Sequence, residues 1–274
     1  MSNMTAQKPK FSAMISTEGY QRMINNALRD PKRAQRFIAS ITSAVATNPS
    51  LQECDPATIL SGALLGESLG LSPSPQLGQY YLVPFKNNKK GTTDAQFQLG
   101  YKGYVQLALR SGYYKHLNVI AVKVGELVRF NPLTEEVELD LNPDELDREA
   151  SATIGYLASF EYLNGFRKTI YWSKEKMEAH ALRYSKGYAA KKGYTFWEKD
   201  FDAMAFKTML RQLISKWGIM SVDLQTAFEA DVVAEQDGDY VQAVEGKMPA
   251  SDPAEPPREA LEGGEAKQVS LDDV

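Results

Sequence analysis

The sequence is poor in the residues that usually build metal, redox and nucleophilic centres. It has one cysteine in 274 residues, Cys54, which has no partner for an internal disulfide and is typical of a reducing compartment. Its two histidines, His116 and His180, lie far apart, and neither belongs to a metal-ligand spacing such as HExxH. The sequence therefore indicates no cofactor and no metal site built on these residues.

Patterns for membrane spans and nucleotide loops are also missing. No apolar run approaches the roughly 20 residues of a membrane span, and the first ten residues lack the apolar stretch of a signal peptide, so we expect a cytoplasmic protein. There is no Walker A loop, and GYKGY at residues 100–104 lacks dinucleotide-binding spacing. Glu135 and Glu136 lie in a charged run that is more typical of a solvated strand edge than of a Mg²⁺ site. We expect a protein that is not an enzyme.

Charge is divided unequally along the chain. Residues 229–274 contain 13 acidic and 3 basic residues, which leaves 22 acidic and 28 basic residues in residues 1–228, a balance of +6. A basic body with an acidic tail hints at polyanion binding by the body and at an interaction tail. A lysine-rich solvated surface is the common alternative, so charge alone is weak support.

Two segments carry strong helix-start signals. Asp30 before Pro31 and Asp55 before Pro56 each place an N-cap ahead of a proline at the first helical position. Apolar residues then recur at helical spacing, which predicts helices over residues 31–47 and 56–69. The first 28 residues are polar without clear periodicity, and we expect a flexible N-terminal arm there.

Strand patterns dominate the middle of the chain. Residues 79–85 and 95–99 read as two strands joined by a polar, basic connection, which predicts a β-hairpin. Residues 117–141 are rich in β-formers, and Asn164-Gly165 is a two-residue turn signal between residues 152–163 and 166–172. These segments predict an antiparallel β-meander.

Helices return after the meander. Ser173 is placed to cap a helix over residues 174–185, and a long amphipathic helix is expected around residues 200–218. The composition after Phe228 is acidic and poor in aromatics, which predicts a disordered tail. The fold class is therefore α+β: N-terminal helices, a β-hairpin and an antiparallel meander packed with a long C-terminal helix. We expect an arm over residues 1–28, one domain over 29–228 and a tail over 229–274.

Basic and aromatic residues alternate in three stretches: residues 101–115, 166–172 and 191–197. Single-stranded nucleic acid suits this combination, because cations neutralise phosphates and aromatic faces stack on bases at about 1–3 kcal/mol per base. Core packing is the better explanation for at least half of the aromatics. For Tyr101, stacking and packing are equally good explanations, whereas Lys102 is hard to explain as core.

Several long motifs resemble the RecT family of phage and prophage recombination proteins. They are LGYKGYVQLALRSGYY, NGFRKTIYWS, DFDAMAFKTMLRQLISKWG and the stretch from DPATIL to QYYLVPF, and together they run from about Ser50 to Ser221. The resemblance implies ATP-independent binding of single-stranded DNA and annealing of complementary strands in homologous recombination and repair. It also implies assembly of the 29–228 domain into a homo-oligomeric ring or filament, and an exonuclease that supplies the strands.

The resemblance and the residue types together nominate a DNA-binding set. The cations expected at phosphates are Lys102, Arg110, Lys115, Arg167, Lys168, Lys207 and Arg211. The aromatic residues expected near bases are Tyr101 and Trp172. We expect the acidic tail to recruit the exonuclease or a host single-strand binding protein, or to serve solubility alone. The alternatives for the whole chain are a protein that coats single-stranded DNA without annealing it and, with less support, a metal-dependent nuclease.

Overall fold

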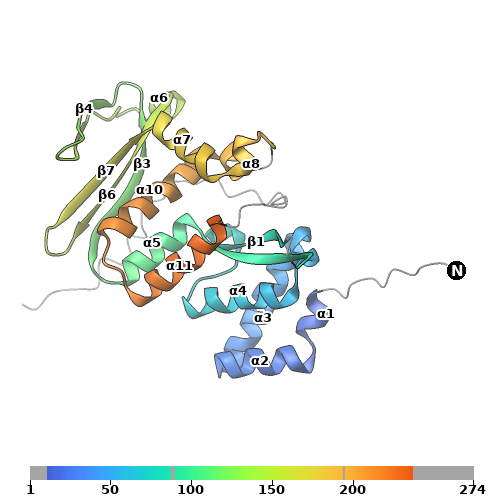
Figure 1. Ribbon diagram of the computed structural model, residues 1–274. Coiled ribbons are helices and arrows are strands. Elements are labelled where there is room, and N and C mark those ends of the chain that lie inside the picture. Colours follow the sequence, from blue (N-terminus) through green and yellow to red (C-terminus); the bar gives the residue numbers. More distant parts are fainter. Residues whose placement is uncertain (1–10, 88–89, 194, 237–274) are drawn as a thin grey trace, which may run out of the picture.

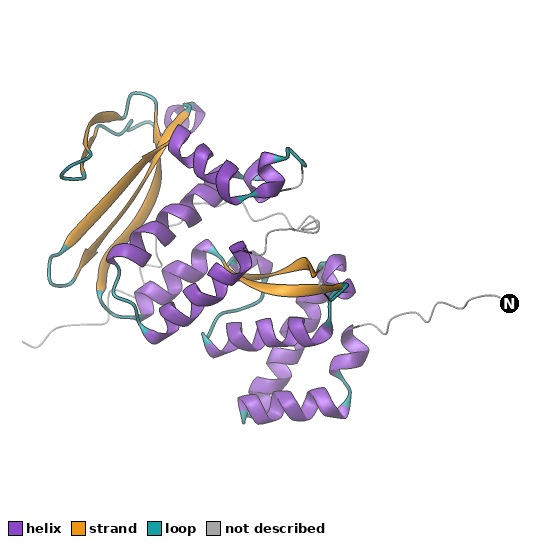
Figure 2. Ribbon diagram, in the orientation of Figure 1, coloured by secondary structure: helices purple, strands orange, loops and turns teal. Residues whose placement is uncertain are grey.

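The structure is a computed structural model that describes residues 11–87, 90–193 and 195–236. It is a mixed α+β fold in which helices and three small antiparallel sheets alternate along the chain (Figures 1 and 2). One end of the molecule holds the N-terminal helices and the β1–β2 hairpin. The other end holds the three-stranded sheet β3–β6–β7, and α5, α10 and α11 lie between the two (Figure 1). The expected α+β class is confirmed.

The N-terminal helices are α1 (Phe11–Ile15), α2 (Glu18–Leu28), α3 (Pro31–Thr47) and α4 (Pro56–Ser68), with a 3₁₀ turn, η1 (Pro49–Glu53), before α4. Two of them, α3 and α4, begin at the predicted N-cap residues. The Asp30 and Asp55 side chains accept hydrogen bonds from the backbone N–H groups of Lys32 at 2.9 Å and Ala57 at 3.0 Å, as N-cap residues do.

The expectation of a flexible arm is wrong for residues 11–28. They form α1 and α2, and Phe11, Ile15 and Ile24 are buried in the main core. Burial of these three side chains gives the segment its structure, although its sequence carries no cap signal as strong as Asp-Pro. Residues 1–10 lie outside the described residues.

The predicted hairpin forms from β1 (Tyr80–Asn87) and β2 (Thr92–Leu99), with Tyr80 opposite Leu99 and Asn87 opposite Thr92. A 3₁₀ turn, η2 (Pro75–Leu77), leads into it. The rings of Tyr80 and Phe97 stack with 5.0 Å between their centroids, and α4 and α11 pack against β2. The hairpin leads directly into α5 (Tyr101–Arg110), so its position sets the position of the GYKGY motif.

The larger sheet consists of β3 (Tyr114–Lys123), β6 (Thr153–Tyr162) and β7 (Arg167–Ser173), with β6 in the middle. The chain turns at Asn164-Gly165 as expected, but the predicted two-residue loop is wrong, because Tyr162 N–H donates to the Phe166 carbonyl at 2.9 Å and leaves residues 163–165 in the loop. Gly165 has a φ of +84°, and the Asn164 side chain accepts a bond from Phe166 N–H at 3.0 Å. The sheet packs on α10 (Phe201–Trp217). Three helices precede α10 in the sequence: α7 (Lys174–Tyr184), which Ser173 caps, α8 (Lys186–Ala189) and α9 (Phe196–Lys199).

The meander is interrupted between β3 and β6. β4 (Leu127–Asn131) and β5 (Glu136–Leu139) form a separate two-stranded sheet, and α6 (Glu145–Ala150) returns the chain to β6. The excursion starts and ends at one place, because Lys123 of β3 pairs with Thr153 of β6. The chain therefore leaves the sheet and comes back to the same edge of β3.

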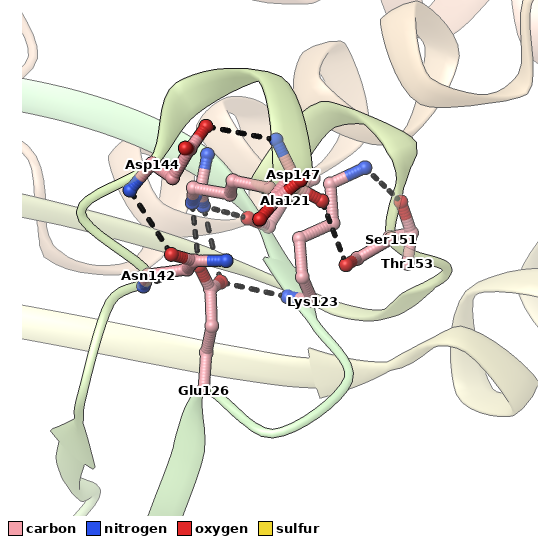
Figure 3. A network of polar contacts seen from close by, with 9 residues as sticks. Ala121, Lys123, Glu126, Asn142, Asp144, Asp147, Ser151 and Thr153 are labelled. Atoms are coloured by element: carbon pink, nitrogen blue, oxygen red, sulfur yellow. Dashed lines mark hydrogen bonds and ion pairs between the residues drawn. The ribbon is translucent and has the colours of Figure 1, made fainter.

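A buried carboxylate closes this excursion (Figure 3). Glu126 is 2% exposed, and it accepts bonds from Arg148 Nε at 2.5 Å and from the backbone N–H groups of Lys123 at 2.8 Å and Asn142 at 3.3 Å. Arg148 also donates to the Ala121 carbonyl at 2.7 Å. Burial alone would raise the pKa of Glu126, but these donors more than offset it and the pKa lies below its ordinary value.

The expected boundary between domain and tail after Phe228 falls inside a helix. α11 runs Val222–Gln236, and Leu224, Ala227, Phe228 and Asp231 are buried. The acidic composition that begins at Glu229 therefore includes a residue of the interior, Asp231, and the folded domain extends at least to Gln236. The predicted tail over residues 237–274 lies outside the described residues.

Candidate nucleic-acid interface

The GYKGY motif is a close contact between two backbone segments. Gly100 is the N-cap of α5, and its N–H donates to the Gln79 carbonyl at 2.8 Å. A Cβ on Gly100 would lie 2.1 Å from the Gly78 carbonyl oxygen, and one on Gly103 would lie 2.0 Å from that of Gln79. Both positions therefore require glycine. The helix begins at Tyr101, so Tyr101 and Lys102 occupy its first turn and not a loop ahead of it.

A crevice lies beside this first turn, where the β1–β2 hairpin and α5 meet α9 and α10. Its lining residues are Tyr81, Val83, Gln98, Leu99, Gly100, Tyr101, Phe196, Ala203, Met204 and Lys207. Three aromatic rings and one ammonium group thus share a small surface. Burial raises the pKa of both Tyr81 and Tyr101, so their hydroxyls stay protonated and uncharged at neutral pH.

Tyr101 combines the two roles that its sequence left open. Its ring is half-buried, packs against the main core and lies 6.4 Å from the Phe206 ring, centroid to centroid. It also lines the crevice. One side of the Tyr101 ring therefore packs against the core, and another side faces the crevice.

Lys102 does not itself line the crevice, but it lies near Tyr81, which does. Its methylene groups come within 3.6 Å of the point where Gly78 would carry a Cβ, and the Tyr81 hydroxyl lies 3.2 Å from that same point. Within the described part of the chain, no ion pair or hydrogen bond neutralises its ammonium group. Lys102 is thus the predicted cation near the crevice that has no ion pair or hydrogen bond to a described residue.

Lys207 and Arg211 share one carboxylate, that of Asp231. The Asp231 side chain is 1% exposed, with Lys207 Nζ 3.3 Å from Oδ1 and Arg211 Nη1 3.8 Å from Oδ2. The same carboxylate accepts from the Tyr104 hydroxyl at 2.7 Å and from Leu99 N–H at 3.2 Å. Lys207 lines the crevice, whereas Arg211 lies toward α7 and acts on His180 there. The pKa of His180 is lowered to about 4, first by burial and then by the positive charges of Arg211 and Arg183.

Arg110 has a structural partner. Its guanidinium donates to the Leu69 carbonyl at 2.6 Å and lies against Gly70, at the C-terminal end of α4. A cation at this end of a helix satisfies a carbonyl that the helix itself leaves free. Arg110 therefore joins α5 to α4.

The remaining predicted residues lie on the three-stranded sheet or against α7. Lys115 and Arg167 both pair with Glu161, each at 2.9 Å, and Lys115 first and then Arg167 lower the pKa of that carboxyl. Lys168 pairs with Glu135 and lies 3.8 Å above the Trp217 ring.

Trp172 is half-buried between His180, 5.4 Å away, and Lys176, 4.6 Å from its ring centre. Like Lys115, Arg167 and Lys168, it belongs to the three-stranded sheet and does not line the crevice. The structure thus divides the predicted set between two places.

Of the residues that line the crevice, the predicted DNA-binding set contained only Tyr101 and Lys207. Tyr81, Gln98, Phe196 and Met204 come from segments far apart in the sequence, and only tertiary packing brings them together. Exposed lysines without an ion pair to any described residue also stand on the hairpin and on the α8–α9 segment; they are Lys86, Lys90, Lys186, Lys191, Lys192 and Lys199. Three of them, Lys90, Lys191 and Lys192, belong to the basic runs NKK and AKKG of the sequence. Tyr194 lies outside the described residues.

The described residues offer neither a metal-binding cluster nor a membrane-spanning helix. They hold no group of three or more His, Cys, Asp or Glu side chains arranged to bind a metal ion. None of their helices has the length and apolar character needed to cross a membrane.

Fold and site together define a mixed α+β protein that gathers aromatic and cationic side chains at one crevice. Residues 35–245 match the model of the RecT family, so the chain belongs to that family. It is 46% identical over 196 residues to the uncharacterized protein YqaK of Bacillus subtilis, covering 72% of this chain and 63% of YqaK. It is 29% identical over 221 residues to the protein RecT of Escherichia coli, covering 80% and 79% of the two chains.

Proposed function

We propose that this chain binds single-stranded DNA without sequence preference and anneals complementary strands without ATP. The observation that carries the proposal is the crevice, where Tyr81, Tyr101 and Phe196 lie beside Lys207 and Lys102 borders them. Aromatic faces stack on any base, and ammonium groups neutralise any phosphate, so this chemistry suits a strand of any sequence. Family membership agrees with this proposal.

The expected division of labour follows from the side chains. Lys102 and Lys207 hold phosphates near the crevice, while Tyr101 and its aromatic neighbours contact bases. The exposed lysines of the hairpin and of the α8–α9 segment extend the cationic surface along the strand. Because annealing gains about 1.4 kcal/mol per stacked step, the reaction needs no hydrolysis, and the second strand is recognised by base pairing.

A second contact region is proposed at the sheet. Lys115, Arg167, Lys168 and Trp172 remain candidates there, although Glu161 and Glu135 already offset part of their charge. Their contribution to affinity is therefore expected to be smaller than that of Lys102. Arg110 and Arg211 are expected to act through the fold that they hold in place.

We also propose that copies of the chain assemble on DNA as a ring or filament, and that residues 237–274 recruit an exonuclease or a host single-strand binding protein. These residues hold ten acidic and three basic side chains, which disfavours DNA contact. A tail that serves solubility alone is the alternative, and a pull-down with and without residues 237–274 separates the two.

The test of function is the pairing rate of two complementary labelled oligonucleotides with purified protein. The reaction contains no ATP, is run with and without EDTA, and its strands are checked on a denaturing gel. Faster duplex formation with intact strands is expected. Bound but unpaired strands would indicate a coating protein, and EDTA-sensitive cleavage would indicate a nuclease.

A further inference from the structure

A buried carboxylate lies directly behind the crevice. Asp231 of α11 accepts hydrogen bonds from Leu99 N–H of β2 and from the Tyr104 hydroxyl of α5. It also forms ion pairs with Lys207 and Arg211 of α10. Three elements thus converge on one side chain from a fourth. Nothing in the local sequence of α11 suggests this, because Asp231 stands among the acidic residues that begin at Glu229.

The charges at this point are unequal. Lys207 and Arg211 lie one helical turn apart, where like charges repel, and their side chains are only 16% and 14% exposed. Asp231 contributes one negative charge beside these two cations, so its loss would raise the local formal charge by one. Lys207 would also lose its ion-pair partner among the described residues, which is costly at this degree of burial.

The geometry leaves Lys207 able to act in two directions. A lysine ammonium has three N–H donors, and among the described residues Lys207 has Asp231 as its ion-pair partner. Its side chain also lines the crevice together with Tyr101 and Met204. One donor therefore faces the buried carboxylate, and donors remain for a ligand phosphate.

We propose that Asp231 is a positioning residue for DNA binding: it fixes the Lys207 ammonium at the crevice and limits the positive charge that the strand meets. This inference rests on the proposed function. With one more positive charge, the site would bind the DNA backbone more tightly and with a stronger dependence on salt. With Asp231 in place, Lys207 holds a phosphate while the strand can still shift until its bases find their complements.

The test compares Asp231→Asn, Asp231→Glu and Tyr104→Phe in the full chain. Each is titrated with a fluorescent oligothymidine strand at salt concentrations from 50 to 200 mM, after a thermal melt has shown cooperative unfolding. Asn keeps the shape but removes the charge, Glu keeps the charge but moves it, and Phe removes one hydrogen bond to Asp231 without changing any charge.

Asp231→Asn is expected to bind more tightly at 50 mM salt, with a salt slope steeper by about 0.7, the value for one more phosphate on a single strand. Its advantage over wild type should then shrink about 2.5-fold by 200 mM. Asp231→Glu should bind more weakly with the wild-type slope, and Tyr104→Phe should keep the wild-type slope.

A folded Asp231→Asn protein whose affinity falls while its slope stays unchanged would overturn the proposal, because Asp231 would then only support the fold. If this variant does not fold, Asp231→Glu decides: wild-type affinity in a folded protein would refute a positioning role. Wild-type protein that fails to bind the oligonucleotide would instead refute the proposed function, so the two failures are distinguishable.

Discussion

Gly103→Ala separates local helix propensity from tertiary packing. Gly103 lies in the first turn of α5, and alanine is favoured over glycine in a helix by about 1 kcal/mol. From propensity alone the substitution should therefore stabilise the protein. The structure reverses the sign, because the new Cβ would lie 2.0 Å from the Gln79 carbonyl oxygen and 2.8 Å from Leu99 Cδ1.

The magnitude follows from that contact. Ordinary contacts begin near 3.4 Å, and the nearest atom is backbone, so α5 must move away from residues 78–79 by more than 1 Å. This displacement weakens the hydrogen bond from Gly100 N–H to Gln79, about 1 kcal/mol, and adds overpacking strain of about 1–3 kcal/mol. After the propensity gain, a net loss of about 2 kcal/mol remains, or about 4–8 °C in melting temperature.

Gly19→Ala is the matched control. Gly19 is also helical, in α2, and a Cβ there would meet nothing within 4 Å, so this variant should be unchanged or more stable by up to about 1 kcal/mol. Urea denaturation of both variants measures the two free energies of unfolding. Equal stabilisation of Gly103→Ala and Gly19→Ala would refute the close backbone contact. Because Tyr101 and Lys102 share that helical turn, Gly103→Ala should also weaken binding to DNA.

Three further predictions concern buried charges. Glu126→Gln should lower the free energy of unfolding by about 3 kcal/mol, as loss of one partner of a buried ion pair does. Since the fold lowers the pKa of Glu126, the difference in stability from wild type should be full above pH 4.5 and shrink below it. An undiminished difference at pH 3 would contradict this. The pKa of His180 falls to about 4 in the fold, so wild type should lose stability between pH 6.5 and 4 relative to His180→Phe; parallel pH profiles in thermal melts would argue against that shift. Truncation after Phe228 should destabilise the domain because it removes Asp231, whereas truncation after Gln236 should not; equal melting temperatures would refute the extended boundary.

Local signals in the sequence were enough to place several elements. Asp30 and Asp55 predicted two helix starts because an N-cap acts on N–H groups two residues away. Asn164-Gly165 predicted the place of a hairpin because Gly165 adopts a positive φ at no steric cost. Helices α1 and α2 were missed because they depend on packing against each other and against α3, and their own sequence carries no cap signal as strong as Asp-Pro.

The candidate site was harder to predict because charge neutralisation is a long-range property. Lys102 and Lys115 look alike in the sequence, yet Lys115 pairs with Glu161, 46 residues further on, and Lys102 pairs with no described residue. Asp231 was assigned to the tail because its neighbours are acidic, although its own side chain is buried. The sequence therefore shows which residues are cationic, but it does not show which of these cations lacks an ion pair and is available to a phosphate.

The most direct test of the account is the salt dependence of single-stranded DNA affinity for Lys102→Gln. The control is Lys32→Gln, an exposed lysine of α3 that is not part of the crevice. If Lys102 contacts a phosphate at the crevice, its loss should weaken binding and reduce the salt slope by about 0.7, while Lys32→Gln leaves the slope unchanged. Equal slopes for wild type and both variants would contradict the assignment of this crevice as the DNA-binding site.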